Sequence, residues 1–460
     1  MSGLPTDWEQ RAQEPQQAGF VLGLDVGSSV IRCHVYDRAA RVCGSSAQKV
    51  ESLYPQTGWV EIDPDVLWIQ FVTVIKEAVK AAGIQMSQIV GLGISTQRAT
   101  FITWNKKTGN HFHNFISWQD LRAVELVKSW NNSLIMKVIF FFCDLDIIVF
   151  FLLFLIDEYI LYNIIGLIYV NMYILMICFY AQMCWSGIIT SLISIPLSLL
   201  PPVRDTSHNF GSVDEEIFGV PIPIVALVAD QQSAMFGECC FQTGDVKLTM
   251  GTGTFLDINT GNSPQQTIGG FYPLIGWKIG QEVVCLAESN AGDTGTAIKW
   301  AQQLDLFTDA AETEKMAKSL EDSEGVCFVP SFSGLQVFFF KSMAITDIFL
   351  PHPNLYIYHS VTLKFEAEKL CSDGNSFIMQ MTSDLINENI DRPADIDMSC
   401  LGAASLAGLA VGFWTDKEEL KKLRQSEVVF KPQKKCQEYE TSMENWAKAV
   451  KRSMNWYNKT

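Results

Sequence analysis

The sequence contains no CxxC pair, no secretory leader and no excess of positive charge. Its 12 cysteines among 460 residues are scattered singly apart from Cys239 and Cys240, which indicates reduced intracellular thiols rather than a disulfide framework. The formal net charge of −16 excludes a general surface for nucleic acid. The six histidines lack the spacing of metal ligands, so no zinc site is expected. Any phosphate site must therefore be local and built mainly from backbone donors.

Two stretches show no pattern of a globular fold. Residues 138–180 contain no Lys, Arg or Pro, and the part from 159 to 180 is long enough to span a bilayer. A membrane span is less favoured because positively charged flanking residues are few, and a buried core segment is less favoured because the run has no amphipathic period. We favour the interpretation that residues 137–182 are foreign to the fold, since such residue types are typical of translated non-coding sequence. Residues 337–376 are a second irregular stretch.

Two similar turns stand far apart in the chain. In residues 20–29 (FVLGLDVGSS) and 246–254 (VKLTMGTGT), an apolar run enters a turn of glycine and hydroxyl residues. Glycine permits positive φ and close approach, so backbone N–H groups and hydroxyls can converge on an anion. The first turn lacks the Lys of a Walker A loop and leads back into a strand, which predicts a hairpin over residues 20–36. Two such turns suggest a nucleotide held between two related halves.

Other local patterns place polar residues at the ends of predicted strands. Residues 89–94 are predicted to be a buried strand that delivers Arg98, and residues 224–229 a strand that delivers Asp230 at a helix start. Asp63 and Pro64 predict the start of a helix. A small-residue run over 402–412 predicts a close-packed helix, and further helices are predicted from residue 294 and near the C-terminus.

Asp230 is the first choice for the chemistry. In phosphoryl transfer an Asp commonly accepts the proton of the attacking hydroxyl. The alternative is a plain helix N-cap, and the two phosphate-binding turns favour the catalytic interpretation.

Other candidates have ordinary alternatives. Asp25 could hold Mg²⁺ through water or stabilise a turn. Arg98 could bind a substrate hydroxyl or the transferred phosphoryl group, or lie on the solvated surface. Gln231 could bind a polyol hydroxyl or be an exposed helix-start residue. Asp120 and Arg122 are interpreted as a structural ion pair. Hydroxyl donors to phosphate, or ordinary turn residues, are Ser28, Ser29, Thr252 and Thr254.

These motifs together resemble the FGGY carbohydrate kinases, and among them the glycerol kinases. The resemblance covers roughly residues 20–136, 183–336 and 377–455. It rests on Leu24-Asp25-Val-Gly27-Ser28-Ser29, GWVEIDP at 58–64, Ser95-Thr-Gln-Arg98, Trp118-Gln-Asp120, Ala229-Asp230-Gln-Gln232 and Met250-Gly-Thr-Gly253.

The resemblance implies an α/β chain with the two-domain actin-like, ribonuclease H-like ATPase fold. The implied units are a disordered lead-in (1–19), an N-terminal domain (20–238), a C-terminal domain (245–425) and a charged helical tail (426–460). The implied reaction is ATP-dependent, Mg²⁺-assisted phosphorylation of glycerol to sn-glycerol 3-phosphate, in the cytoplasm. The implied base is Asp230, with Arg98, Asp230 and Gln231 on the polyol. The implied ATP contacts are Ser28, Ser29, Thr252, Gly295, Lys299 and Asn375.

The chain departs from the family pattern in ways that leave alternatives open. Ala99 stands where the family usually has an acid that binds glycerol hydroxyls, which allows another polyol or sugar as substrate. The stretches at 137–182 and 337–376 replace parts of both domains and of the adenosine loop, which allows a catalytically impaired binding protein on a kinase scaffold. The oligomeric state, with a homo-oligomer as one option, stays open.

Overall fold

The computed structural model describes most of the chain outside the two irregular stretches. The described residues are 19–126, 129, 170–171, 178–179, 184–185, 187–192, 195–251, 253–264, 271–291, 294–320, 322–330, 363–367, 375–395 and 397–453. The lead-in, apart from Gly19, lies outside them, and so do Thr252 and most of 137–182 and 337–376. No helix of the described part is long and apolar enough to cross a membrane.

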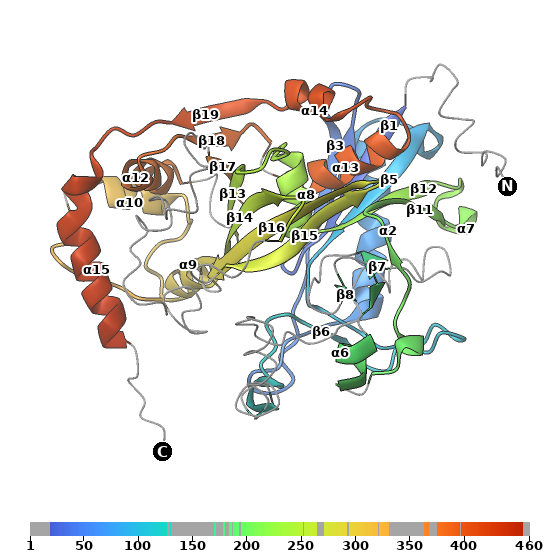
Figure 1. Ribbon diagram of the computed structural model, residues 1–460, viewed down its shortest axis with the longest axis horizontal. Coiled ribbons are helices and arrows are strands. Elements are labelled where there is room, and N and C mark those ends of the chain that lie inside the picture. Colours follow the sequence, from blue (N-terminus) through green and yellow to red (C-terminus); the bar gives the residue numbers. More distant parts are fainter. Residues whose placement is uncertain are drawn as a thin grey trace.

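The first sheet is a mixed sheet of six strands (Figure 1). The β1–β2 hairpin confirms the predicted hairpin, with its turn at residues 27–29. β5 pairs parallel with β1, and β12 pairs parallel with β5. The strands, in spatial order, are β11 (Ser207–Ser212), β12 (Pro223–Ala229), β5 (Ile89–Thr96), β1 (Phe20–Val26), β2 (Val30–Tyr36) and β3 (Val42–Lys49).

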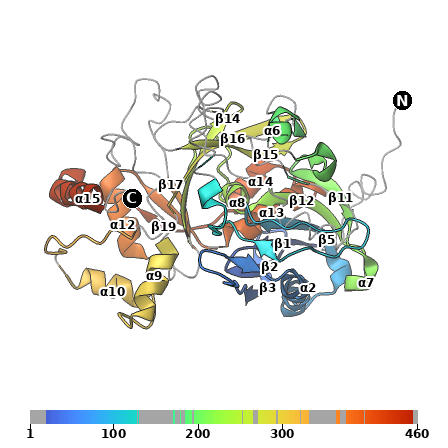
Figure 2. The ribbon, with the colours of Figure 1, turned by 90° about the horizontal axis from the view of Figure 1, so that it is seen from below.

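Helices cover both faces of this sheet, as Figure 2 shows with α2 below it and α13 above it. The side chains of β1 alternate between the two layers: Leu22 and Leu24 join the core shared with α2 (Pro64–Ala81), and Val21 joins the core shared with α13 (Met398–Ala410). Asp63 caps α2, because its Oδ1 accepts from the backbone N–H groups of two first-turn residues. The predicted start of this helix is confirmed.

The helix α13 approaches the sheet at backbone distance. A Cβ added to Gly23 of β1 would lie 2.0 Å from the carbonyl oxygen of Cys400, and one added to Gly93 of β5 would lie 1.9 Å from that of Ala403. Only glycine therefore fits at these two strand positions. The predicted close-packed helix is confirmed. It packs on the first sheet, although its residues lie in the predicted C-terminal domain (245–425). The predicted domain boundaries remain a prediction.

The second sheet repeats the order of the first. β13 (Val246–Met250) and β14 (Thr254–Gly261) form an antiparallel hairpin, β16 (Glu282–Ala291) pairs antiparallel with β14, and β17 (Leu363–Ala367) pairs parallel with β13. A hairpin followed by a parallel neighbour thus occurs in both sheets, as expected of two related halves. The strands, in spatial order, are β15 (Tyr272–Ile279), β16 (Glu282–Ala291), β14 (Thr254–Gly261), β13 (Val246–Met250), β17 (Leu363–Ala367), β18 (Ile390–Pro393) and β19 (Ser426–Phe430).

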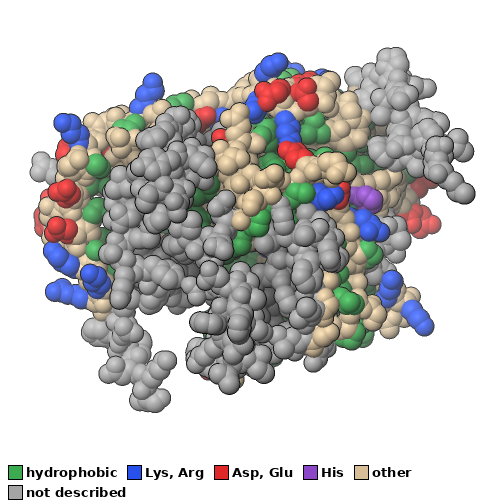
Figure 3. Space-filling view, viewed as in Figure 1, with side chains coloured by type: hydrophobic (Ala, Val, Ile, Leu, Met, Phe, Trp, Pro, Cys, Tyr) green, Lys and Arg blue, Asp and Glu red, His purple; other side chains and the backbone are tan. Residues whose placement is uncertain are grey.

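The remaining elements flank the two sheets. Small paired strands are β4 (Glu61–Ile62) with β6 (Phe115–Ile116), β7 (Val170–Asn171) with β10 (Val203–Arg204), and β8 (Cys178–Phe179) with β9 (Cys184–Trp185). The other α-helices are α6 (Gly187–Leu192), α7 (Glu215–Phe218), α8 (Asp230–Gly237), α9 (Thr294–Gln303), α10 (Glu312–Lys318), α12 (Ser376–Ile386), α14 (Lys417–Leu423) and α15 (Glu440–Ser453). The helices predicted from residue 294 and near the C-terminus are therefore present. On the face shown in Figure 3, charged side chains of both signs are interspersed over the described atoms.

Candidate active site

Asp230 lies at the carboxyl ends of the parallel strands of the first sheet. It is the first residue of α8 and follows Ala229, which pairs with Thr96 of β5; Thr96 pairs in turn with Val26 at the end of β1. Since neighbouring strands lie about 4.8 Å apart, Asp230 is two strands away from the turn of the first hairpin. The helix cap is Ala229, so the plain N-cap interpretation of Asp230 is wrong.

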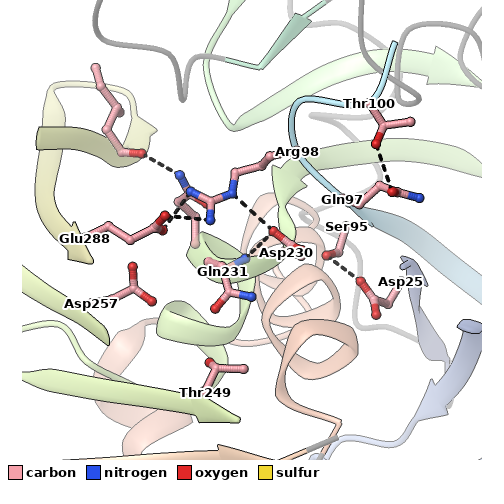
Figure 4. A network of polar contacts seen from close by, with 12 residues as sticks. Asp25, Ser95, Gln97, Arg98, Thr100, Asp230, Gln231, Thr249, Asp257 and Glu288 are labelled. Carbon is pink, nitrogen blue, oxygen red and sulfur yellow. Dashed lines mark hydrogen bonds and ion pairs between the residues drawn. The ribbon is translucent and has the colours of Figure 1, made fainter. Parts of the chain in front are cut away.

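Arg98 lies between two acids from different halves of the molecule (Figure 4). Its Nη2 donates a hydrogen bond to Oε1 of Glu288 of the second sheet at 2.8 Å, its Nη1 lies 2.7 Å from Oε2 of the same carboxylate, and its Nε lies 3.4 Å from Oδ1 of Asp230. The ring of Phe255 lies 5.5 Å from the guanidinium carbon. The solvated-surface interpretation of Arg98 is therefore wrong, and this side chain joins the two sheets at the site.

A row of polar residues crosses four strands of the second sheet. Lys247 of β13 stands directly opposite Asp257 of β14, Asp257 opposite Glu288 of β16, and Glu288 opposite Tyr272 of β15. The Nζ of Lys247 lies 3.1 Å from Asp257, and the hydroxyl of Tyr272 donates to Glu288. The lysine and both acids are fully buried. Charged groups placed in a core need partners, and direct cross-strand pairing supplies them here.

The same row reaches α8 through Gln231. Lys247 donates to the side-chain oxygen of Gln231 at 2.8 Å and to the hydroxyl of Thr249 at 2.6 Å. Gln231 is 7% exposed, so the alternative of an exposed helix-start residue is wrong. Asp230 and Gln231 are adjacent in the chain. Asp230 lies beside Arg98, which binds Glu288 of the second sheet, and Gln231 accepts a hydrogen bond from Lys247 of that sheet.

Burial and neighbouring charges shift the pKa values of the acids of the site in opposite directions. Burial raises the pKa of Asp230, although the Arg98 charge opposes it. Burial also raises the pKa of Asp257 well above its usual value. Burial alone would raise the pKa of Glu288, but the charge and hydrogen bonds of Arg98 outweigh it and lower the pKa. Glu288 is therefore the charged counter-ion of Arg98, whereas Asp230 and Asp257 both have an enhanced affinity for a proton, and of these two Asp230 is the one beside Arg98.

Asp25 stands beside the first hairpin turn. The hydroxyl of Ser95 donates to its Oδ1 at 2.9 Å, and its Oδ2 lies 3.7 Å from where a Cβ on Gly27 would be. One carboxylate oxygen therefore faces the turn where phosphate is expected. Mg²⁺ in kinases is held by few carboxylates plus phosphates and waters, so a single carboxylate here fits a water-mediated Mg²⁺ site.

The predicted ATP-binding residues lie on four elements. Ser28 and Ser29 form the first turn, and Gly295 and Lys299 lie on α9, where Gly295 is buried and Lys299 exposed. The first residue of α9, Thr294, bonds Thr254 of the second hairpin by its hydroxyl at 2.6 Å. Thr252 lies outside the described residues, and these nucleotide contacts remain predictions.

Asn375 has a structural role. Its side-chain oxygen accepts from the backbone N–H groups of Phe377 and Ile378 at the start of α12, and its amide nitrogen donates to Thr313 at 3.2 Å. The nucleotide contact predicted for Asn375 remains a prediction beside this capping role.

The polar row and Phe255 were not predicted from the sequence. One signal was available at Lys247, the one charged residue in the strand sequence VKLTM of β13. The predicted structural ion pair is confirmed, because Arg122 binds both Asp120 and Glu61.

One group of potential metal ligands also comes together away from Asp230. Ligand atoms of His34, Asp395 and Asp397 lie within 4.8 Å of one another. Arg32 already pairs with Asp397, so a positive charge is present in this group and it forms an ion-pair network between β2 and the start of α13.

The arrangement around Asp230 suits transfer to an alcohol. A carboxylate with a raised pKa can take the proton of a hydroxyl, and Arg98 beside it offers positive charge. The turn of the first glycine hairpin lies at the same carboxyl ends of the parallel strands from which Asp230 comes.

The comparisons with known proteins point to one family. A model of the N-terminal domain of the FGGY family of carbohydrate kinases matches residues 20–163. Over an alignment of 531 positions that covers 100% of both chains, the sequence is 71% identical to Glycerol kinase 5 of Homo sapiens. The chain belongs to the FGGY family of carbohydrate kinases. It is accordingly a phosphotransferase whose acceptor is an alcohol group.

Other FGGY kinases agree with this assignment. Glycerol kinase 2 of Thermotoga maritima is 32% identical, covering 95% of this chain and 99% of that one. The crystal structure of Plasmodium falciparum glycerol kinase with ADP matches with a TM-score of 0.76 at 23% identity, covering 96% of this chain and 99% of that one. This likeness confirms the predicted two-domain actin-like ATPase fold. The human alignment has 531 positions against the 460 residues of this chain, so that FGGY relative contains segments that this chain lacks.

Proposed function

We propose that this FGGY kinase transfers the γ-phosphoryl group of ATP to a primary hydroxyl of glycerol, forming sn-glycerol 3-phosphate. The observation that carries the proposal is the position of Asp230, which lies at the carboxyl ends of the parallel strands beside the first glycine hairpin and has a pKa raised by burial. Relatives named glycerol kinase, at 71% and 32% identity, support glycerol as the acceptor.

Asp230, Arg98 and Gln231 have different roles in the proposed reaction. Asp230 removes the proton of the attacking hydroxyl as the bond to phosphorus forms, which contributes about 10²- to 10⁴-fold. Arg98 stabilises negative charge near the transferred group, and Gln231 binds a second oxygen of the polyol. Catalysis of this kind depends mostly on positioning and charge stabilisation, which the buried Arg98–Glu288 pair provides.

The two hairpins hold the triphosphate. Backbone N–H groups and the hydroxyls of Ser28, Ser29 and Thr252 bind phosphate oxygens, with Gly295 and Lys299 on the nucleotide side. Asp25 is the residue that would hold Mg²⁺ through water. When bound, that ion would neutralise part of the triphosphate charge.

A different polyol or sugar is the second candidate acceptor, and Ala99 is the observation that favours it. A methyl group follows Arg98 at the position where the family usually has an acid, and Ala99 adopts a left-handed conformation with φ of 55°. A site without that carboxylate loses one acceptor for a substrate hydroxyl, which changes the preference among polyols. A binding protein without turnover is the third candidate, since the human relative contains segments that this chain lacks.

A substrate panel separates the three candidates. The full chain is incubated with ATP, Mg²⁺ and each of glycerol, xylitol, ribitol and xylulose, and both ADP release and the phosphorylated product are measured. We expect the highest kcat/KM with glycerol. A higher value with another acceptor would select the second candidate. ATP binding in calorimetry with no phosphorylated product from any acceptor would select the third.

A further inference from the structure

The buried ammonium of Lys247 determines which end of the Gln231 amide faces the reacting alcohol. Lys247 is 0% exposed, and its Nζ has three acceptors within 3.1 Å: Gln231, Thr249 and Asp257. An ammonium has three donors and no acceptor, so its partner on Gln231 must be the amide oxygen. The orientation of this amide is therefore fixed by chemistry.

The amide nitrogen of Gln231 is left for a ligand. Among the residues that the structure describes, none accepts a hydrogen bond from this nitrogen, while the backbone N–H of Gln231 donates to Oδ1 of Asp230 at 2.8 Å. Gln231 is 7% exposed as a residue, and its amide nitrogen is not among the fully buried unpaired polar atoms of the described residues, so a ligand can reach it. Figure 4 shows Gln231 beside Asp230, with Thr249 and Asp257 on the side of the second sheet.

We propose that Lys247 is a positioning residue for substrate specificity. By holding the oxygen of Gln231, it presents the amide N–H₂ to the substrate oxygen that neighbours the reacting hydroxyl. This inference rests on the proposed function. The inferred substrates carry two neighbouring oxygens. One belongs to the hydroxyl that donates a hydrogen bond to Asp230, and the other accepts a hydrogen bond from the amide of Gln231.

The row across the second sheet makes this positioning rigid. Asp257 stands directly opposite Lys247 in the antiparallel register, and Glu288 stands opposite Asp257 and holds Arg98. The two polyol-binding donors, Gln231 and Arg98, are thus both oriented from the same row. A polar group whose supporting partners are buried and paired keeps its geometry when substrate arrives.

The test compares glycerol with propane-1,3-diol, which lacks the flanking oxygen. We expect wild-type protein to prefer glycerol in kcat/KM by about tenfold, the effect of one hydrogen bond to a buried donor. In Lys247→Met the amide can rotate, and the preference should fall to about twofold with kcat for propane-1,3-diol little changed. The control is Lys278→Met, which removes an ammonium paired with Asp205, a residue between β10 and β11, and should keep the preference.

Two further variants test the same role of Lys247 independently. Lys247→Met with Asp257→Leu removes the acid that the first change leaves without its partner, and Gln231→Glu keeps an acceptor for Lys247 but presents oxygen where wild type presents N–H. Both should lose the preference for glycerol. A purely structural role for Lys247 would instead lower kcat/KM for glycerol and propane-1,3-diol equally, and an unchanged preference in folded Lys247→Met or in Gln231→Glu would overturn the inference.

Calorimetric titration with glycerol and with propane-1,3-diol separates this inference from the proposed function. If wild type turns over no acceptor, the kinase proposal fails, while the ratio of the two binding constants in wild type and variants still decides the role of Lys247. If wild type phosphorylates glycerol and the ratio is insensitive to Lys247→Met and to Gln231→Glu, only the inference fails.

Discussion

Glu288→Gln should damage both the fold and the active site. The carboxylate is fully buried, accepts one hydrogen bond from Arg98 and makes a second ion-pair contact with it; the Arg98 side chain is 15% exposed. Losing one charge of a buried pair costs about 3–5 kcal/mol, and glutamine keeps one acceptor, so we expect the free energy of unfolding to fall by about 3 kcal/mol. That is a large share of a stability of about 5–15 kcal/mol. Urea unfolding followed by fluorescence measures the change.

The pH dependence of this loss has a defined sign. The pKa of Glu288 in the folded protein lies below its ordinary value of 4.5, because Arg98 outweighs the effect of burial. The contribution of the pair is therefore fully present above pH 4.5 and is lost as pH falls through the folded pKa. The stability difference between wild type and Glu288→Gln should shrink below pH 4.5.

Activity gives a second readout of the same change. Burial is the main cause of the raised pKa of Asp230, and the charge of Glu288 adds to it. Removing that charge lowers the pKa of Asp230, so the acid limb of the kcat/KM profile should move to lower pH and kcat should fall with the weaker base.

Glu427→Gln is the matched control for the stability effect. Glu427 pairs with Arg392 but is 52% exposed, so its loss should cost less than about 1 kcal/mol. A Glu288→Gln protein as stable as Glu427→Gln, or one whose acid limb moves to higher pH, would refute the reasoning.

Other predictions concern the frame of the site. Gly93→Ala should lower the free energy of unfolding, measured in urea, by about 1–3 kcal/mol, because the new Cβ would lie 1.9 Å from the carbonyl oxygen of Ala403. Gly187→Ala is the control and should leave the free energy of unfolding unchanged, because the nearest atom to its new Cβ would be 3.9 Å away. Ala99→Gly should raise the stability by about 0.5–1 kcal/mol, seen as a higher Tm, since it removes a left-handed alanine. Asp63→Ala should cost about 1 kcal/mol through loss of the α2 cap, measured by thermal unfolding. A Gly93→Ala, Ala99→Gly or Asp63→Ala protein with the stability of wild type would contradict the prediction made for it.

Local sequence patterns were enough for the elements that carry Asp230 and Arg98. The glycine turns predicted both hairpins, Asp63 with Pro64 predicted the start of α2, and apolar runs predicted the strands that end near Arg98 and Asp230. These features depend on neighbouring residues, and the sequence displays them directly.

The polar row could not be predicted in the same way. Its members face one another only because four strands pair in one register, and a slip of one residue would move Lys247 or Glu288 to the other face of the sheet. The packing of α13 on the first sheet is equally long-range, since it joins Gly23 to Cys400 across most of the chain. The left-handed backbone at Ala99 follows from that tertiary frame, because alanine alone does not favour it.

The most direct test of the account is the rate at which Asp230→Asn transfers the γ-phosphoryl group of ATP to glycerol. The change keeps the shape of a side chain that is 27% exposed, and Asp65→Asn at a 77% exposed side chain serves as the control. We predict a kcat about 10²- to 10⁴-fold below wild type for Asp230→Asn, with an unchanged thermal unfolding midpoint and full activity in the control. Formation of sn-glycerol 3-phosphate by Asp230→Asn at the wild-type rate would contradict the assignment of Asp230 as the base.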